Sequence, residues 1–311
     1  MRVLITGGSG MVGRNFQEHS AASDLEIIAP SSQDLDLRCF TRTLAYLETV
    51  RPDMVIHMAG TVGGIQANIK EPVRFLVENL DMGRNLVMAS RECGILKLIN
   101  LGSSCMYPRN IERPLTEDMV LTGELEPTNE GYALAKIVTS RLCEYVSRET
   151  PQFAYKTLIP CNLYGRWDKF DPAHSHLIPA IIHKIHIAKR DELPSVEIWG
   201  DGLARREFLY ATDFADFLHQ AVRRFDDLPM LMNVGLGFDH TVREYYEAAR
   251  AVIGYRGEFV FDLDKPVGMQ RKLTDVSRLT EWGWKAQTDL KDGIAATYQY
   301  YLEHFSRMEG I

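Results

Sequence analysis

A tyrosine and a lysine four residues apart are the side chains in this sequence best suited to acid–base chemistry. Tyr132 and Lys136 stand in a stretch with helical spacing, residues 132–149, so both side chains lie on one helix face. A lysine ammonium beside a phenol stabilises the phenolate, and we therefore expect the pKa of Tyr132 to fall toward neutrality. Such a phenol can give its proton to a carbonyl oxygen while hydride reaches the carbon. Taken alone, the pair is more often an ordinary surface contact on a helix.

A serine just beyond a predicted strand, residues 97–101, adds a candidate donor to the same carbonyl oxygen. Ser103 lies in the sequence Leu-Gly-Ser-Ser-Cys-Met-Tyr-Pro, residues 101–108. Its hydroxyl can stabilise negative charge that develops on the oxygen during hydride transfer. Together with a glycine-rich turn upstream, this serine makes chance the minor explanation of the tyrosine–lysine pair.

The glycine-rich turn predicts a dinucleotide site. Gly7, Gly10 and Gly13 follow a predicted strand, residues 2–6, and open a helix, in the Gly-x-x-Gly-x-x-Gly spacing typical of short-chain dehydrogenases. Glycines let a pyrophosphate approach the backbone, and the helix N-terminus supplies free N–H groups. The alternative is a strand-to-helix turn that holds no ligand. The residues expected to contact the cofactor here are Gly7, Gly8, Ser9, Gly10, Met11, Val12 and Gly13.

The end of the second predicted strand favours NADP over NAD. A carboxylate there would bind the ribose 2′-hydroxyl of NAD, but the first acid is Asp34, after Ser31 and Ser32. We expect the two serines to donate to a 2′-phosphate, with Arg14 or Arg38 neutralising its charge. The alternative is that the serines only form a turn.

Alternating strands and helices predict an α/β fold with a doubly wound parallel sheet, the Rossmann arrangement. The expected strands are residues 2–6, 25–29, 54–58, 97–101 and 155–159, and the expected helices begin at Met11 and cover residues 41–50, 72–91 and 132–149. After residue 166 the pattern changes, and a helix is expected at 208–225. We therefore divide the chain into a cofactor-binding domain, residues 1–166 plus about 207–230, and a smaller C-terminal α/β lobe, about 167–206 and 231–311.

Composition excludes several classes of protein. Of the 311 residues, 45% are hydrophobic and 25% charged, which excludes a disordered chain, and no apolar stretch is long enough for a membrane span. The N-terminus lacks a secretory signal, so we expect a cytoplasmic protein. A net charge of -7 argues against a nucleic-acid partner. The five cysteines form no Cys-x-x-Cys pair, which indicates free thiols and no metal site.

Longer motifs resemble those of one family. They are residues 62–68, 101–108, 126–136, 162–165, 175–179 and 271–276. On these motifs the sequence resembles the extended short-chain dehydrogenase/reductases, and within them the GDP-L-fucose synthases. The resemblance runs nearly end to end. It implies NADPH as cofactor, a GDP-sugar as substrate, and a homodimer formed through the helix of Tyr132 and its neighbour.

The resemblance also implies a bifunctional reaction. The expected activity is 3,5-epimerisation of GDP-4-keto-6-deoxy-D-mannose followed by reduction at C4, which makes GDP-L-fucose. Cys105 and His176 match the residues that carry the epimerisation, and thiol and imidazole groups suit proton transfer next to a ketone. Without the family motif, a cysteine beside a strand end is usually only a small buried apolar side chain. A histidine in a loop more often makes a hydrogen bond to the backbone. His174 stands close by, so which imidazole donates a proton stays open.

Further site residues follow from the same resemblance. The cofactor site extends to Leu101, Gly102, Lys136, Pro160, Asn162, Leu163 and His176. The substrate site takes in Lys184, Trp199, Arg206 and Lys272, with Arg271 a further candidate for the pyrophosphate. Lys184 stands where the family commonly has arginine, which puts a two-pronged phosphate contact in doubt. Trp199 offers a stacking surface, although a core tryptophan is nearly as common.

Three rival functions stay open at this point. One is an epimerase/reductase of another GDP-4-keto sugar, such as a dideoxy or heptose precursor. A second is a UDP- or dTDP-sugar 4-epimerase that keeps its NAD bound, against which the missing acid after the second strand counts. A third is a non-enzymatic NADP-binding sensor or scaffold, which would have no need of Ser103, Tyr132 and Lys136.

Overall fold

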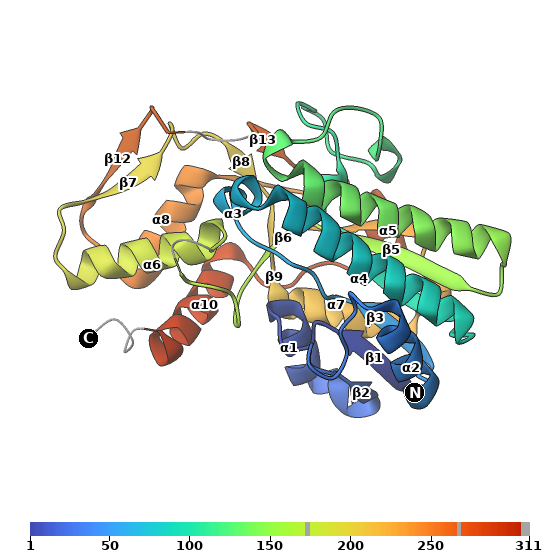
Figure 1. Cartoon of the computed structure of the whole chain (residues 1–311). Helices are drawn as coiled ribbons and strands as arrows, with labels where there is room; N and C mark the ends of the chain where they lie inside the picture. The colour runs from blue at the N-terminus through green and yellow to red at the C-terminus, as the bar shows by residue number, and fades with distance from the viewer. Residues whose placement is uncertain (172–174, 266–268, 306–311) are drawn as a thin grey trace.

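A six-stranded parallel sheet forms the centre of the larger part of the molecule (Figure 1). The structure is a computed structural model that describes residues 1–171, 175–265 and 269–305. The strands, in sheet order, are β10 (Leu231–Val234), β5 (Ala154–Pro160), β4 (Lys97–Leu101), β3 (Met54–His57), β1 (Arg2–Thr6) and β2 (Glu26–Ile28). Every neighbouring pair is parallel. The predicted doubly wound sheet is confirmed.

Helices cover both faces of this sheet because the strands are apolar on both sides. Val3 and Ile5 of β1 pack in one core with α1 (Met11–Glu18) and α7 (Ala211–Arg223), whereas Leu4 between them packs in another. The second core lies under three helices, α2 (Phe40–Val50), α4 (Pro72–Glu92) and α5 (Glu130–Glu149). Alternation along the strand thus divides the interior into two layers.

A smaller lobe with its own core lies beyond one end of the sheet (Figure 1). Its helices are α6 (Leu177–Arg190), α8 (Val242–Ile253) and α10 (Leu290–His304). Its strands are β7 (Ser195–Trp199) paired with β12 (Glu258–Asp262), and β11 (His240–Thr241), β8 (Arg205–Arg206) and β13 (Arg271–Lys272) in a second small sheet. A third pair, β6 (Asn162–Tyr164) and β9 (Phe208–Tyr210), leads from the large sheet into the lobe. In the part of the chain that the structure describes, no helix is both long and apolar enough to cross a membrane.

Two predicted boundaries are wrong. Residues from about 231 were expected in the lobe, but β10 pairs with β5 as the sixth strand of the large sheet, with Leu231 opposite Thr157. The helix expected over 208–225 begins only at Ala211, because residues 208–210 form β9. Later still, α9 (Ser277–Trp282) returns to the large core, where Trp282 and Trp284 are buried. The chain therefore crosses between the two parts more often than its composition indicated.

One buried carboxylate ties these crossings together. Glu207, which stands between β8 and β9, is 1% exposed. Its Oε1 accepts hydrogen bonds from the backbone N–H groups of Leu236 and Gly237, at 2.6 and 2.9 Å. Its Oε2 accepts from the N–H and the hydroxyl of Thr274, at 2.9 and 2.7 Å. Because this one carboxylate accepts four hydrogen bonds, it holds the lobe strands at the end of the large sheet.

Candidate active site

The turn after β1 is tight where the fold demands it and open where a ligand would approach. Gly7 has φ +72°, and a Cβ there would lie 2.8 Å from the Cα of Ala59. A Cβ on Gly13 would lie 2.4 Å from the carbonyl oxygen of Gly7, so α1 packs on the turn only with glycine. A Cβ on Gly10, however, would meet nothing closer than that same oxygen at 3.4 Å. The space beside Gly10, at the N-terminus of α1, is therefore open to a dinucleotide pyrophosphate.

The serine turn after β2 is held by its own neighbour. The hydroxyl of Ser31 donates to Oδ2 of Asp34 at 2.6 Å, and its backbone N–H donates to the same oxygen at 3.1 Å. These bonds lower the pKa of Asp34. Ser31 thus forms a turn, which is the alternative that the sequence left open for the two serines. Arg38 pairs with Asp36, at 2.9 Å. Contact of Ser31 or Ser32 with a 2′-phosphate stays a prediction.

Lys136 lies buried between α5 and the end of β4. Its Nζ donates a hydrogen bond to the carbonyl oxygen of Leu101 at 2.8 Å and lies 5.8 Å from the centre of the Tyr132 ring. A Cβ on Gly60 would come within 3.9 Å of the same Nζ, so the loop after β3 passes beside the ammonium. Burial lowers the pKa of Lys136 to about 8. The four-residue spacing therefore brings lysine and tyrosine together as the sequence predicted.

The expectation that the pKa of Tyr132 falls is wrong. Desolvation of the phenolate raises the pKa above its ordinary value, and the nearby sulfur of Cys105 raises it further. Only a hydrogen bond from Ser103 works in the opposite direction. Lys136 gives its hydrogen bond to the backbone carbonyl of Leu101 rather than to the phenol. Tyr132 therefore holds its proton, which is the form that a proton donor needs.

Cys105 stands beside the same phenol. It lies in a short 3-10 helix, η2 (Ser104–Met106), that follows β4 and begins where the backbone N–H of Cys105 donates to Oγ of Ser103 at 3.4 Å. The side chain is buried, and burial raises the pKa of its thiol. The ammonium groups of Lys272 and Lys136 and the Ser103 hydroxyl act against this rise. Cys105 also packs in an apolar cluster with Met106 and Ile159, as the alternative for this cysteine expects. The two lysines act on the pKa of its thiol in addition to this packing.

Two cations from the lobe face this group side by side. Arg206 in β8 and Lys272 in β13 are direct neighbours across a parallel strand pair. Desolvation lowers the pKa of both, and their mutual repulsion lowers the pKa of Lys272 further. Glu126 is close enough to raise the pKa of both cations. Sequence reasoning missed Glu126, although it opens the motif 126–136 and precedes Tyr132 by six residues.

The other predicted substrate residues lie elsewhere in the lobe. Nζ of Lys184 donates to the carbonyl oxygen of Glu197 at 2.7 Å. Trp199 is 47% exposed, and its Nε1 donates to a carboxylate oxygen of Glu197 at 2.9 Å, so it is no core tryptophan. Arg271 pairs with the buried carboxylate of Asp239 at 2.6 Å, which gives it a structural role. In the ranges described, no contact joins Lys184 or Trp199 to the group around Tyr132.

His176 is the residue directly before helix α6, at the edge of the site. Its imidazole is 43% exposed, and its Nδ1 lies 3.9 Å from Oδ1 of Asp168. The preceding residue borders the loop after β3, because a Cβ on Gly64 would meet the carbonyl oxygen of Ser175 at 3.4 Å. Among the described residues, no contact joins this imidazole to Cys105. His174, the other candidate proton donor, lies outside the described residues.

The remaining predicted cofactor residues stand at the carboxyl ends of the strands. Leu101 ends β4 and Gly102 follows it, and Pro160 ends β5. In β6, Asn162 gives its side-chain amide to the carbonyl oxygen of Glu207 at 2.9 Å. Leu163 follows it in the same strand. In open parallel sheets ligands bind at this edge.

A buried threonine that the sequence did not single out fixes the loop after β3. The hydroxyl oxygen of Thr6 accepts hydrogen bonds from the N–H groups of Met58 and Ala59, each at 3.2 Å, and lies 2.9 Å from Nδ1 of His57. Burial lowers the pKa of His57 to about 3, so its imidazole stays neutral. The loop then continues past Lys136 toward Ser175. The only feature of the sequence that could have indicated this role of Thr6 is its place, as a hydroxyl residue directly before the glycine turn.

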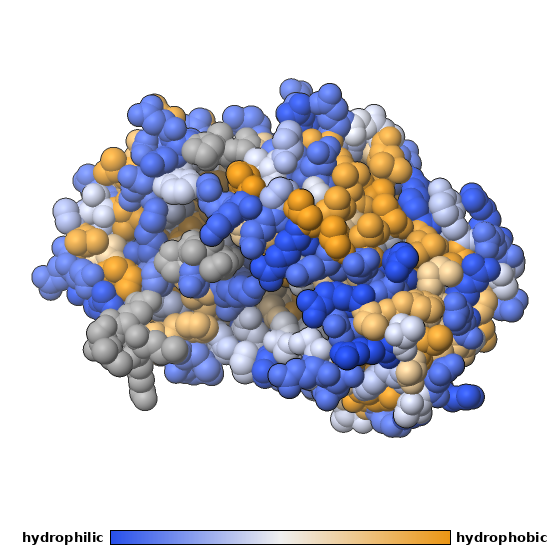
Figure 2. Space-filling model, in the orientation of Figure 1, coloured by the Kyte–Doolittle hydropathy of each residue, from blue (hydrophilic) through white to orange (hydrophobic). Residues whose placement is uncertain are grey.

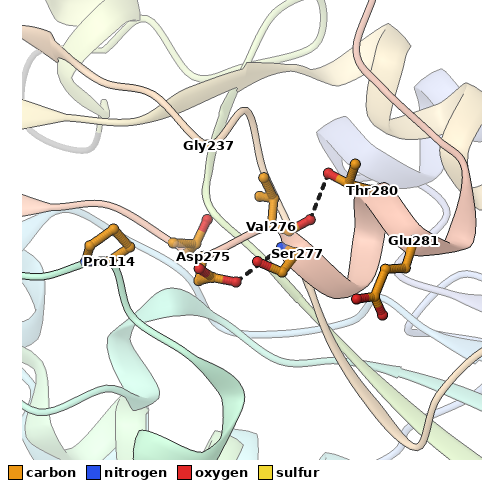
Figure 3. Close-up of a pocket in the computed structure, with 8 residues that line it drawn as sticks. Pro114, Gly237, Asp275, Val276, Ser277, Thr280 and Glu281 are labelled. Atoms are coloured by element: carbon orange, nitrogen blue, oxygen red, sulfur yellow. Dashed lines mark hydrogen bonds between the residues drawn. The ribbon is translucent and has the colours of Figure 1, made fainter.

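A hollow of about 390 Å³ opens beside α9, away from these residues (Figure 3). None of the predicted catalytic residues lines it. In Figure 3, Thr280 bonds the backbone of Val276, and Asp275 accepts the N–H of Ser277 at 2.9 Å. In the described ranges, no group of three or more His, Cys, Asp or Glu residues is placed to hold a metal ion.

Comparison with known proteins agrees with this geometry. Residues 3–235 match the model of the NAD dependent epimerase/dehydratase family. The chain is 55% identical to a GDP-L-colitose synthase of Yersinia pseudotuberculosis, over 97% of this chain and 98% of the relative. It is 54% identical to a GDP-L-fucose synthase of Azorhizobium caulinodans, over 97% and 96%. A Campylobacter jejuni GDP-D-glycero-L-gluco-heptose synthase, solved in the presence of NADPH, is 29% identical with a TM-score of 0.89, over 97% of this chain and 98% of that one.

The lowered pKa of Lys136 predicts how the expected ketone reduction depends on pH. If the reduction needs the ammonium, its rate falls as the pH rises through about 8, because the buried amine then loses its proton. Lys136→Arg should remove this fall, since a guanidinium stays charged. Nicotinamide absorbance in single-turnover reactions measures both profiles.

Lys97→Arg is the matched control, because Lys97 is a surface lysine paired with Asp226. It should keep the wild-type profile. A wild-type rate that stays level from about pH 7 to about pH 10 would show that the charge of Lys136 is not needed.

Proposed function

The chain belongs to the NAD dependent epimerase/dehydratase family, and we propose that it is an NADPH-dependent epimerase/reductase of a GDP-4-keto-6-deoxy sugar. The proposed substrate is GDP-4-keto-6-deoxy-D-mannose and the proposed product GDP-L-fucose. One observation carries the proposal: the phenol of Tyr132 and the thiol of Cys105 share one serine, Ser103, and the buried Lys136 lies near both. A protonated phenol serves reduction, and an adjacent thiol serves proton transfer to carbon.

In the reduction, Tyr132 acts as the proton donor. NADPH, held along the turn at Gly10 and beside Lys136, would supply hydride to the carbonyl carbon at C4. Ser103 donates to the carbonyl oxygen, and Tyr132 passes its proton to that oxygen as negative charge develops. The Lys136 ammonium then stabilises the phenolate that remains. The NADPH-containing heptose synthase structure supports NADP as the cofactor.

In the epimerisation, Cys105 and His176 exchange protons at the carbons next to the ketone. A carbonyl at C4 acidifies the hydrogens at C3 and C5, so a base removes one and an acid returns it on the opposite face. The thiol of Cys105 is protonated near neutral pH because burial raises its pKa, which suits the acid. Lys272 and Lys136 stabilise the thiolate left after donation. His176 stands across the loop after β3 as the partner group.

The cation pair of the lobe suits a nucleoside diphosphate. Arg206 and Lys272 lie side by side and are partly desolvated, and an anion between the strands and the Cys105 group would compensate both charges. Lys184 and Trp199 are proposed to contact the more distant part of the nucleotide. The relatives named GDP-L-fucose synthase and GDP-L-colitose synthase support GDP as the nucleotide.

A second substrate, a GDP-4-keto dideoxy sugar, is favoured by the 55% identity to the relative named GDP-L-colitose synthase. The two candidates differ in chemistry. A sugar without a hydroxyl at C3 has no stereocentre there, so epimerisation would invert C5 alone.

We also propose a homodimer through α4 and α5. Apolar side chains are exposed at regular spacing on these neighbouring helices, and Figure 2 shows a hydrophobic patch over them. Val73 and Val77 on α4 are 73% and 46% exposed, and Val138 on α5 is 46% exposed. Patches of this kind mark protein interfaces.

The dimer is tested by sedimentation. The wild-type protein should show the mass of two chains, and Val138→Glu, which places a charge in the patch, should show the mass of one chain. A wild-type monomer would contradict the proposal.

The proposed reaction is tested by offering the purified protein GDP-4-keto-6-deoxy-D-mannose and its dideoxy counterpart with NADPH. With the first, we expect oxidation of NADPH, formation of GDP-L-fucose, and deuterium from heavy water at both C3 and C5. Turnover of the dideoxy sugar alone would select the second substrate. Binding of NADPH without turnover of either sugar would reject the proposal.

Cys105→Ser should slow the exchange of the C3 and C5 hydrogens about 100-fold or more, because a serine hydroxyl is a far weaker acid than a thiol. Cys143→Ser is the matched control, since Cys143 is an equally buried thiol in the core under α5. The control should exchange at the wild-type rate. Unchanged exchange in Cys105→Ser would remove this residue from the mechanism.

A further inference from the structure

A buried carboxylate without a full set of partners lies next to His176. Asp168 is 6% exposed. Its Oδ1 accepts the backbone N–H of Lys169 at 2.8 Å and faces Nδ1 of His176 at 3.9 Å. Its Oδ2 is buried and, in the described part of the chain, accepts no hydrogen bond. A buried carboxylate is costly unless a cation or donor compensates it, and His176 is the ring that faces this one.

The loop that carries Asp168 is firmly anchored on both sides. Trp167 donates from Nε1 to a carboxylate oxygen of Glu18 at 3.0 Å, and the guanidinium of Arg14 lies 4.3 Å from its ring centre. Phe170 is buried, with its ring centre 5.1 Å from that of Tyr301. Asp168 lies between these two anchored aromatic residues, so its position does not depend on the imidazole.

His176 is anchored by helix α6, which it precedes as the N-cap residue. Its carbonyl oxygen accepts the N–H of Ala180 at 3.0 Å, and Ile178 and Pro179 in the first turn are buried. Two separately fixed pieces of backbone thus bring the carboxylate and the imidazole together. Because Nδ1 is the nitrogen that faces Asp168, Nε2 on the other side of the ring points away from the carboxylate.

We propose that Asp168 is a positioning residue for His176 in the epimerisation. The carboxylate stabilises the neutral tautomer that carries its proton on Nδ1, and so leaves the Nε2 lone pair to exchange a proton with the sugar. The catalytic part of this inference rests on the proposed function, whereas the tautomer is a property of the protein alone.

The tautomer is read directly from nitrogen chemical shifts of the imidazole in ¹⁵N-labelled protein. At a pH where the ring is neutral, wild-type His176 should show a protonated Nδ1. The signal is assigned by its loss in His176→Gln. In Asp168→Asn the proton should move toward Nε2, the tautomer that a free imidazole favours. The asparagine oxygen can still accept the N–H of Lys169, so the loop should keep its fold.

Glu18→Gln is the matched control. Glu18 holds the same loop through Trp167 and Arg166, but does not face the imidazole. It should leave the tautomer of His176 unchanged. A protonated Nε2 in the wild type, or an unchanged tautomer in Asp168→Asn, would overturn the inference without any substrate.

The catalytic part is tested by hydrogen exchange in heavy water. Asp168→Asn should slow exchange at C3 and C5 about tenfold or more, while reduction of a ketosugar that is already epimerised keeps its wild-type rate. Wild-type exchange in this variant would overturn the positioning role. If the wild type itself turns over no GDP-4-keto sugar, the proposed function fails, and the tautomer measurement still decides whether Asp168 sets the state of His176.

Discussion

The hydrogen bond from the Lys136 ammonium to the Leu101 carbonyl is the interaction on which the site depends. It holds a positive charge in the protein interior, 5.8 Å from the centre of the Tyr132 ring and close enough to lower the pKa of the Cys105 thiol. Burial favours the neutral form of every group there. It therefore keeps the proton on the phenol and on the thiol, and brings the pKa of the lysine down to about 8. Proton delivery to a ketone and to its neighbouring carbons requires protonated acids and a cation near the anions that they leave. The site provides two such acids and one such cation.

The two parts of the molecule meet around this charge. The large sheet supplies Ser103, Cys105 and the glycine turn at the carboxyl ends of its strands, and the lobe supplies Arg206 and Lys272. Glu207 joins them, because its four hydrogen bonds hold the lobe strands against the sheet. An acidic protein thus gathers local positive charge where an anionic substrate would bind, which net charge alone does not reveal.

Sequence periodicity predicted the elements that are locally determined and missed what depends on packing. The strands from residues 2 to 160 and the helix of Tyr132 were predicted because their apolar runs and spacing are strong. The lowered pKa of Tyr132 was wrong, because four-residue spacing shows that Lys136 is near but not that burial and Leu101 determine its effect. Asp168 lies in no motif, and Glu126 opens one that gives no sign of its role. Only the folded chain brings these two carboxylates to His176 and Lys272. The role of Ser31 in a turn likewise depends on where Asp34 points.

The central claim is that Tyr132 gives up a proton that burial has kept on it. It is tested most directly by the single-turnover rate of ketosugar reduction in Tyr132→Phe, with NADPH binding measured on the same samples. Tyr145→Phe, an exposed tyrosine on the same helix, is the control. The account predicts that Tyr132→Phe binds NADPH as the wild type does and reduces the sugar about 100- to 10,000-fold more slowly. Reduction at the wild-type rate would contradict it.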